Sequence, residues 1–282
     1  NGNCACSCNE FEPEKDVMDT WATSSLTPKI ARDLVKNQEM KKKLIPANLR
    51  PQAHDIIRTW AFYTITKSLL HENVIPWKKI AVSGYIMDPY GRGMSKSLGN
   101  VVEPMKLIES YCAEALRYWA ATCSSQGEDT KFQEKELING KKFVTKVYNA
   151  GNFVGKMLDD FDLKKINFDE LELTISDKWI LSRLQKTINE TTQAFEEYNF
   201  GKAISSIRNF FWLEFCDYYV ESAKTRLYNP SHYSKENILA AKYCLNEVLL
   251  TNLKLMAPIL PHISEEVYQS IFAEKTKIKN VH

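Results

Sequence analysis

Short apolar runs, turns and helical stretches alternate over residues 1–127, a pattern typical of an α/β fold. The run 79–83 (Lys-Ile-Ala-Val-Ser) predicts a short buried strand. A helical stretch over 56–70 precedes it, and a glycine- and proline-containing loop follows it. In this loop the segment from Asp88 to Gly91 predicts a turn, because proline presets φ and glycine tolerates positive φ.

After Gly127 the apolar positions recur at helical spacing, in four stripes and a final short helix. The stripes are Leu137, Val144, Val147, Gly151, Val154 and Leu158; Leu181, Leu184, Ile188 and Phe195; Ile204, Ile207, Phe211, Phe215 and Tyr218; and Ile238, Ala241, Leu245, Val248, Asn252 and Leu255. Ser176 and Ser234 are the predicted N-caps of the second and fourth stripes. The final helix is predicted by Ile263, Val267 and Ile271. Since short polar links separate the stripes, they predict an antiparallel bundle.

The overall charge does not favour any class of partner. Among the 282 residues, 37 Lys and Arg stand against 35 Asp and Glu, which leaves a net charge of +2. Any RNA contact must therefore come from local patches. No run reaches the roughly 18 apolar residues of a membrane span, and the N-terminus has no signal-peptide pattern. Seven cysteines, an odd number, do not suggest a disulfide framework, so a reducing cytoplasm is the expected location.

The loop Gly93-Met-Ser-Lys-Ser-Leu-Gly-Asn100 carries the strongest chemical signal in the chain. Such a loop can close over a polyphosphate: the Lys96 ammonium meets phosphate oxygens, the serine hydroxyls donate, and the glycines let backbone N–H groups approach. By composition alone an ordinary surface loop is the favoured interpretation, since Gly, Ser and Lys are common on surfaces.

The literal string Met-Ser-Lys-Ser-Leu-Gly-Asn resembles the KMSKS loop of the class I aminoacyl-tRNA synthetases, which also follows a strand and precedes a helix. Lys96 matches the second lysine of that motif. Gly93 stands where the family has its first lysine, so one phosphate-facing cation is either missing or supplied by Arg92. The resemblance implies that Ser95, Lys96 and Ser97 are catalytic. It also implies an ATP-binding set of His54, Asp55, Arg92, Met94 and Lys96.

Other segments resemble the valyl-tRNA synthetases in particular. These are Asp16–Ser25 and Arg50–Trp60, with Ala53 where the family commonly has glycine. Met256–Glu266 resembles a motif in the helical domain of the Val/Ile/Leu/Met group as a whole, and Trp212–Tyr219 fits the same domain. The resemblance covers residues 12–272. An isoleucyl enzyme is a rival, which the Thr20-Trp-Ala-Thr23 string and the Arg50–Trp60 segment oppose.

By matching positions, Trp21, Ile56 and Trp60 would line a valine pocket. Two indoles and a β-branched residue suit a small branched side chain and exclude larger ones. The alternative is that both tryptophans are ordinary core residues. Asp55 would accept hydrogen bonds from the ribose of ATP, although it could equally cap the following helix. His54 could also be a surface histidine at a helix end.

The resemblance implies the second half of a Rossmann-type nucleotide-binding fold over residues 1–127, followed by a stem-contact region and a helical anticodon-binding domain over 128–282. The HIGH motif and the editing domain of the family do not occur in the sequence, and His54, His71, His232, His262 and His282 stand in other contexts. We therefore expect a piece of a longer valine–tRNA ligase that is inactive alone. The rival is a non-catalytic tRNA-binding paralogue.

Cys4, Cys6 and Cys8 precede the resemblance. They could contribute to a zinc knuckle, but their spacing is not C-x₂-C and no histidine lies nearby, so zinc is not the favoured interpretation.

The implied partners are ATP with Mg²⁺, valine and tRNA(Val), with the chain acting as a monomer. Basic residues available for RNA phosphates are Lys141, Lys142, Lys146, Arg208, Lys224 and Arg226. Candidate stacking partners for bases are Phe210, Trp212, Tyr218, Tyr219 and Tyr228, most of which we expect in the core, leaving Tyr228 free.

Overall fold

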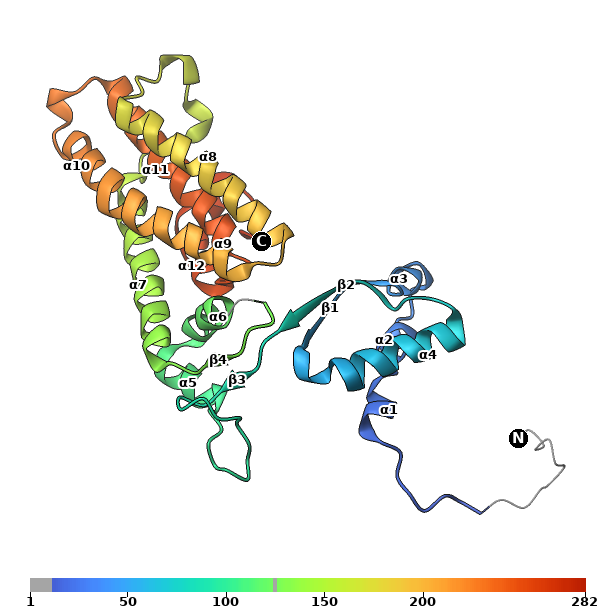
Figure 1. Cartoon of the computed structure of the whole chain (residues 1–282). Coiled ribbons are helices and arrows are strands. Elements are labelled where there is room, and N and C mark those ends of the chain that lie inside the picture. The colour runs from blue at the N-terminus through green and yellow to red at the C-terminus, as the bar shows by residue number, and fades with distance from the viewer. Residues whose placement is uncertain (1–11, 124–125) are drawn as a thin grey trace. The chain divides into compact units, whose positions relative to one another are not determined.

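The computed structural model describes residues 12–123 and 126–282, and the chain divides into two compact units between Tyr85 and Ile86. In Figure 1 the first unit runs from blue to cyan and the second from green to red. Each unit contains a pair of parallel strands, and helices make up most of the second.

The first unit is built on two parallel strands joined by a helix (Figure 1). β1 (Ala47–Ala53) pairs with β2 (Trp77–Ser83) in continuous register. The connection consists of the 3₁₀ turn η1 (His54–Ile56), the π-helix η2 (Ile57–Ala61) and α4 (Phe62–Glu72). The unit begins with α1 (Thr20–Ser24), α2 (Thr27–Leu34) and α3 (Gln38–Lys43).

The predicted strand and the helical stretch before it are confirmed, but the strand is not buried. Ile80 in its middle is 41% exposed. Among the described residues β2 pairs with β1 alone, so its outer edge and much of its face stay open to solvent.

Polar contacts fix the helices of this unit. The Asp19 side chain caps α1 by accepting from the Trp21 N–H at 3.2 Å. Arg32 on α2 forms a bidentate pair with Glu72 on α4, at 2.9 and 3.1 Å. Asn73 then ends α4 in the left-handed conformation with φ 53°.

The second unit begins with the loop region and continues as packed helices (Figure 1). Its first part contains β3 (Ile86–Met87), α5 (Pro104–Tyr111), α6 (Ala113–Thr122) and β4 (Thr130–Lys131), with β3 and β4 paired in parallel. The helices that follow are α7 (Glu134–Met157), α8 (Ile175–Glu196), α9 (Phe200–Asn209), the π-helix η5 (Phe210–Val220), α10 (Glu221–Tyr228), α11 (Lys235–Met256), α12 (Pro261–Ile271) and α13 (Ala273–Thr276). Short 3₁₀ turns lie at Leu163–Lys165, Phe168–Glu170 and Pro230–His232.

The predicted stripes supply much of the core of this unit. Val147 and Val154 on α7 and Leu158 directly after it are fully buried, as are Leu245 and Val248 on α11. A Cβ on Gly151 would lie 2.6 Å from the Val267 side chain, so glycine permits the close approach of α7 and α12 there. The short helix predicted around Val267 is confirmed as α12.

Two details of the helical prediction are wrong. Tyr218 is 61% exposed and Tyr219 is fully buried instead, because this stretch is π-helical and its wider turn shifts the inward face by one residue. Ser176 is not a cap. Thr174 caps α8 in a capping box with Asp177, so the helix begins earlier than predicted, whereas the predicted cap Ser234 is confirmed on α11.

A buried ion pair crosses the helices of the second unit. Arg226 on α10 donates to both carboxylate oxygens of Asp177 on α8, at 2.6 and 2.8 Å. The Tyr219 hydroxyl donates to the same carboxylate at 2.6 Å. Burial alone would raise the pKa of Asp177, but these hydrogen bonds outweigh it and lower the pKa.

The segment that follows the loop packs with the helices of the second unit. α6 contacts α7 and α9, and the ring of Tyr118 lies 5.8 Å from that of Phe143 on α7. The compact units thus divide after Tyr85, whereas the domain boundary after residue 127 remains a prediction based on family resemblance. No helix within 12–123 and 126–282 combines the length and hydropathy that a bilayer crossing needs.

Candidate functional site

The loop that carries Lys96 starts from a tight turn at the end of β3. The Asp88 carbonyl accepts from the Gly91 N–H at 2.9 Å, and Gly91 has φ 84°, a conformation that glycine adopts without strain. The Asp88 carboxylate accepts from the Tyr90 and Arg92 N–H groups at 3.0 and 2.8 Å. The predicted turn is therefore confirmed, and its first residue organises it.

Asn100 closes the loop at its far end. Its carboxamide nitrogen donates to Asp88 and to the Gly93 carbonyl, each at 3.0 Å, and its oxygen accepts from the Ser95 N–H at 3.0 Å. One side chain thus fixes three positions of the loop. In the sequence it is visible only as the last letter of the Gly93–Asn100 string, with no role of its own.

Asp88 is a buried carboxylate that stays ionised. Burial alone would raise its pKa, but hydrogen bonds from the Arg92 backbone, from Asn100 and from the Arg92 guanidinium outweigh burial and lower the pKa to about 2. Around neutral pH the group is a fixed negative charge at the base of the loop.

The loop presents Lys96 to solvent. Its side chain is exposed, and no partner for its ammonium is found among residues 12–123 and 126–282. The neighbouring hydroxyls of Ser95 and Ser97 lie 3.0 Å apart, and the Leu98 N–H donates to Ser95. Gly99 then turns the chain with φ 65°. The arrangement holds the backbone and leaves the cation available for an anion.

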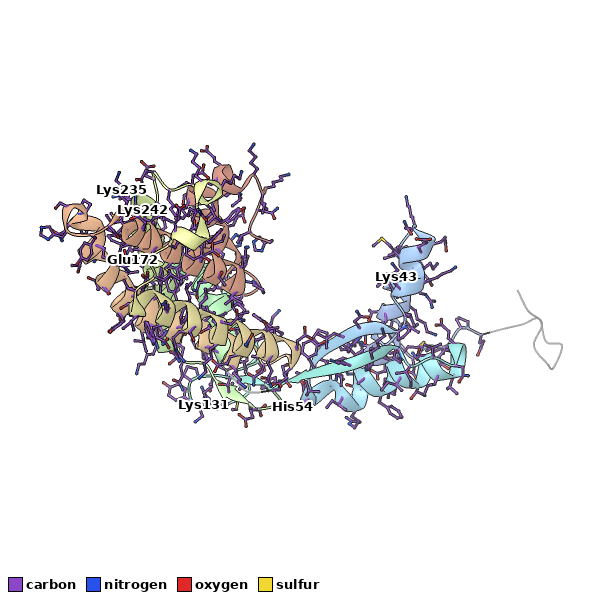
Figure 2. All side chains as sticks on the ribbon, turned by 90° about the horizontal axis from the view of Figure 1, so that it is seen from above. Lys43, His54, Lys131, Glu172, Lys235 and Lys242 are labelled. Atoms are coloured by element: carbon purple, nitrogen blue, oxygen red, sulfur yellow. The ribbon has the colours of Figure 1, made fainter. Side chains whose placement is uncertain are left out.

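Arg92 is engaged in the loop itself. Its guanidinium donates to Asp88 through Nε and pairs with it through a terminal nitrogen, both at 2.8 Å. A role toward phosphate would therefore compete with this pair. A second cation lies close by, since Lys131 on β4, labelled in Figure 2, passes Gly91, where a Cβ would be 2.9 Å from the Lys131 Cε. Lys131 was not predicted, because strand pairing with Met87 brings it to the turn from 40 residues away.

Trp21 and Trp60 belong to the first unit and are both half-buried. The Trp60 indole donates to the Ser24 carbonyl at 3.0 Å, and this bond ties η2 to α1, the helix that carries Trp21. The structure thus brings the elements that carry both tryptophans together. This contact is consistent both with the wall of a valine pocket and with ordinary core packing. The valine pocket stays a prediction.

One face of Trp60 is covered by a cation that was not predicted. The Arg50 guanidinium lies 3.2 Å from the Trp60 ring centroid and 5.1 Å from that of Trp77. It is buried, and burial lowers its pKa. Its Nε and one terminal nitrogen have no hydrogen-bond partner within the described residues. The sequence pattern does not predict this stacking, because Arg50 on β1 and Trp60 on η2 meet only when the two elements pack together.

His54, Asp55 and Ile56 follow directly after β1, at its carboxyl end (Figure 2 labels His54). His54 and Asp55 are exposed, and Ile56 is half-buried. Ligands of parallel α/β folds bind outside the carboxyl ends of the strands, so this is where a nucleotide contact is expected. No side-chain cap from Asp55 is found on the following turn, so the capping alternative has no support in the described residues.

The structure of the second unit shows which of the basic residues predicted to bind phosphate are available for it. Arg226 is only 5% exposed and committed to Asp177, so its predicted availability for phosphate is wrong. Lys224 pairs with Glu221 at 2.6 Å. Lys141 and Lys142 are exposed on α7, and Tyr228 is exposed at the end of α10 as expected. Phe210 and Tyr219 lie in the core.

No cluster of three or more metal-ligating side chains occurs in the part of the chain that the structure describes. Cys4, Cys6 and Cys8 lie outside the described residues. The zinc hypothesis is thus neither supported nor contradicted.

Two family models match the chain. Residues 3–133 match the tRNA synthetases of class I (I, L, M and V), and residues 177–281 match the anticodon-binding domain of tRNA ligase. The chain belongs to the class I aminoacyl-tRNA synthetases. Both matches lie in the order that the motifs predicted.

Curated relatives of the chain within this family include valine–tRNA ligases. That of Rickettsia prowazekii (strain Madrid E) is 43% identical over 273 residues, covering 93% of this chain and 33% of the relative. That of Rickettsia rickettsii (strain Sheila Smith) is 42% identical over 277 residues, covering 95% and 34%. The predicted resemblance to valyl-type synthetases is confirmed, and a non-catalytic paralogue gains no support. The chain spans about a third of the length of these relatives.

Solved synthetase structures share the fold. The leucyl enzyme of Agrobacterium radiobacter K84, in a ternary complex with tRNA and LeuAMS, has a TM-score of 0.70 at 21% identity, covering 95% of this chain and 34% of that one. Mycobacterium tuberculosis methionyl-tRNA synthetase with methionyl-adenylate has a TM-score of 0.71 at 18% identity, covering 93% and 53%. These structures therefore share the fold of this chain, which consists of two small parallel sheets and a helical region.

Proposed function

We propose that this chain is the part of a valine–tRNA ligase that carries the KMSKS-type loop and the helical, anticodon-binding region. The full protein would join valine to ATP, release pyrophosphate, and transfer the valyl group from the adenylate to the 3′ end of tRNA(Val). The observation that carries the proposal is the ordered loop, in which Asp88 and Asn100 fix the backbone while the Lys96 ammonium stays unpaired among the described residues.

Lys96 would act by electrostatics. Its ammonium would stabilise the negative charge on the β and γ phosphates of ATP as the valine carboxylate attacks the α-phosphorus. Ser95 and Ser97 would donate hydrogen bonds to phosphate oxygens, and the Met94 backbone would lie along the nucleotide. Because the loop is held at both ends by one carboxylate–amide contact, little reorganisation is needed when charge develops.

The first unit would bind the rest of the nucleotide and the amino acid. Asp55, with His54 beside it, would meet the ribose at the carboxyl end of β1. Trp21, Ile56 and Trp60 would enclose the valine side chain. Such an apolar wall excludes larger side chains by size, whereas it discriminates weakly against an isosteric hydroxyl amino acid.

Arg92 would have a divided role. It neutralises Asp88 in the structure, and it would reach ATP only by giving up part of that pair. Mg²⁺ would arrive with ATP, held chiefly by phosphate oxygens and water, so a protein cage is not required.

This proposal includes the domain organisation predicted from the sequence. It places a Rossmann-type half-fold over 1–127 and the stem-contact and anticodon-binding regions, with antiparallel helices, over 128–282. It also includes tRNA(Val) as the RNA partner, a monomeric state and a cytoplasmic location, where translation consumes charged tRNA. Because the relatives are about three times as long, we expect no activity from the 282 residues alone.

ATP–pyrophosphate exchange by the full-length protein tests the proposal. Valine should stimulate exchange strongly, while leucine and methionine should not and isoleucine should do so only weakly. Aminoacylation should then require tRNA(Val). Exchange driven by isoleucine in preference to valine would overturn the substrate assignment, and the absence of exchange with every amino acid would overturn the catalytic role.

A further inference from the structure

Arg50 on β1 is a buried cation that lies against aromatic rings instead of a carboxylate. It is 9% exposed, and its guanidinium lies 3.2 Å from the ring centroid of Trp60 on η2 and 5.1 Å from that of Trp77 on β2. Within residues 12–123 and 126–282 no carboxylate pairs with it, and its Nε and one terminal nitrogen have no hydrogen-bond partner. The contact that distinguishes Arg50 is therefore its stacking on Trp60.

Arg226 in the second unit shows how a buried arginine is usually compensated. It is 5% exposed, and both carboxylate oxygens of Asp177 accept hydrogen bonds from it. A buried charge without such a partner costs stability. Costs of this kind are found chiefly at functional sites, where a local rule is broken for the sake of the site. The unmatched burial of Arg50 therefore points to a function in its neighbourhood.

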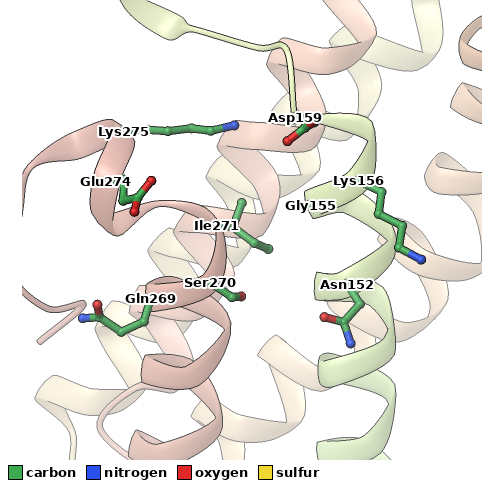
Figure 3. A pocket seen from close by; sticks show the side chains of 9 residues that line it. All are labelled: Asn152, Gly155, Lys156, Asp159, Gln269, Ser270, Ile271, Glu274 and Lys275. Atoms are coloured by element: carbon green, nitrogen blue, oxygen red, sulfur yellow. The ribbon is translucent and has the colours of Figure 1, made fainter.

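The charged groups of a pocket in the second unit are matched as well (Figure 3). This pocket has a volume of about 830 Å³ and lies between α7 and the α12–α13 end of the chain. Its two lysines, Lys156 and Lys275, share it with the carboxylates of Asp159 and Glu274, and Lys275 also donates to a backbone carbonyl. Its charges cancel, so size alone does not mark it as a site, whereas the charge of Arg50 stays uncompensated.

Two contacts hold the Trp60 ring, one at its edge and one over its face. At the edge, the indole N–H donates to the Ser24 carbonyl of α1, the helix that carries Trp21. A single hydrogen bond leaves the ring free to tilt about that bond. The planar guanidinium of Arg50 over the face removes this freedom, because a flat cation stacks on an aromatic ring in a narrow range of orientations.

We propose that Arg50 is a positioning residue for substrate specificity: by covering one face of Trp60 it sets the plane of the indole, and with it the width of the amino-acid pocket. The inference rests on the proposed function, in which Trp60 is a wall of the valine pocket. Since Arg50 covers one face, the substrate would meet the opposite face. Valine and isoleucine differ by one methylene, which a hydrophobic pocket typically discriminates by about 10–200-fold. A ring free to tilt would lose part of this discrimination.

The test uses the full-length protein and ATP–pyrophosphate exchange with valine and with isoleucine. Arg50→Met removes the guanidinium and keeps a long side chain, whereas Arg50→Lys keeps the charge and loses the planar group. In both variants the ratio of kcat/KM for valine to that for isoleucine should fall about tenfold, with KM for valine raised and kcat close to wild type. The matched control, Lys78→Met, removes an exposed cation from β2 of the same sheet and should keep the wild-type ratio.

The 282-residue chain gives a second measurement that does not depend on catalysis. The indole N–H resonance of Trp60, assigned by comparison with Trp60→Phe, reports on the hydrogen bond to Ser24 and on the cation over the ring. In Arg50→Met and Arg50→Lys this resonance should shift and its hydrogen should exchange with solvent faster, whereas Lys78→Met should leave both unchanged. A Trp60 resonance that matches wild type in both Arg50 variants would overturn the proposal.

The role of Arg50 and the proposed function fail differently. If the wild-type protein activates valine while both Arg50 variants keep its preference over isoleucine, the role of Arg50 is overturned and the proposed function stands. The same holds if the variants lose kcat equally for both amino acids, since that is the result of a purely structural role. If the wild-type protein activates no amino acid, the proposed function fails and the role of Arg50 fails with it.

Discussion

The side chains of Asn100 and Asp88 share a hydrogen bond of 3.0 Å, which joins the two ends of the Lys96 loop. Asp88 lies in the turn before the loop and Asn100 lies just after it, so this contact sets the loop's width. Two residues outside the Met-Ser-Lys-Ser string thereby determine where Lys96 stands.

Substituting Asn100 should loosen the loop in a charge-dependent way. Asn100→Ala removes bonds to Asp88, Gly93 and the Ser95 N–H, so the Ser95 amide should exchange its hydrogen faster. Asn100→Asp should be worse at neutral pH, because it places a second carboxylate against Asp88. Amide hydrogen exchange followed by NMR on the 282-residue chain measures both. Leu98→Ala, at an exposed loop position, is the control, and equal Ser95 protection in all variants would contradict this account.

The loop should resist acid down to a low pH. The folded-state pKa of Asp88 is about 2, below its ordinary value of 3.8, so its contribution to stability is complete above the ordinary value and is lost as the pH falls toward 2. An NMR titration of the Asp88 carboxylate should show a midpoint near 2. A midpoint near 4 would mean that the bonds from Arg92 and Asn100 do not persist in solution.

Much of the architecture could be predicted from the sequence, since it rests on periodicity. The Lys79–Ser83 strand, the helix before it and the stripes on α7 and α11 follow from hydrophobic spacing. The exchange of Tyr218 for Tyr219 could not be predicted, because a period of 3.6 residues cannot anticipate a π-helix.

The sequence predicts only those parts of the candidate site whose residues are neighbours along the chain. Lys96, Ser95 and Ser97 are neighbours in sequence, and a family pattern identifies them. Contacts made by folding were missed: Lys131 reaches Gly91 through strand pairing, and Arg50 covers Trp60 only once β1 and η2 are in place. The sequence analysis predicts that Arg226 is available for phosphate, whereas the structure shows it buried and paired with Asp177.

The buried pair of Arg226 and Asp177 should be essential for the stability of the second unit. Arg226→Met leaves the Asp177 carboxylate buried with no cation, which typically costs about 3–5 kcal/mol. Chemical denaturation gives the free energy of unfolding. Lys224→Met is the control, because its pair with Glu221 lies at the surface and should change stability by less than about 1 kcal/mol. Similar losses for both variants would contradict the buried role.

The second unit should be more stable when it keeps α6. Glu114 accepts from the His262 and Ile263 N–H groups, and Arg117 donates to the Ile259 carbonyl at 2.8 Å, so α6 holds the corner between α11 and α12. A fragment of residues 86–282 should therefore unfold cooperatively and at higher denaturant than one of residues 128–282. Equal midpoints for the two fragments would show that α6 adds nothing to this core.

The central claim is that Lys96 stabilises the transition state of valine activation. The most direct test is single-turnover formation of valyl-adenylate by the full-length protein carrying Lys96→Ala. The rate should fall by about 10²–10³, or roughly 3–4 kcal/mol, with little change in valine affinity, because one preorganised charge is lost from the transition state. Lys106→Ala, at an exposed position on the next helix, should react at the wild-type rate. A wild-type rate for Lys96→Ala would contradict the account.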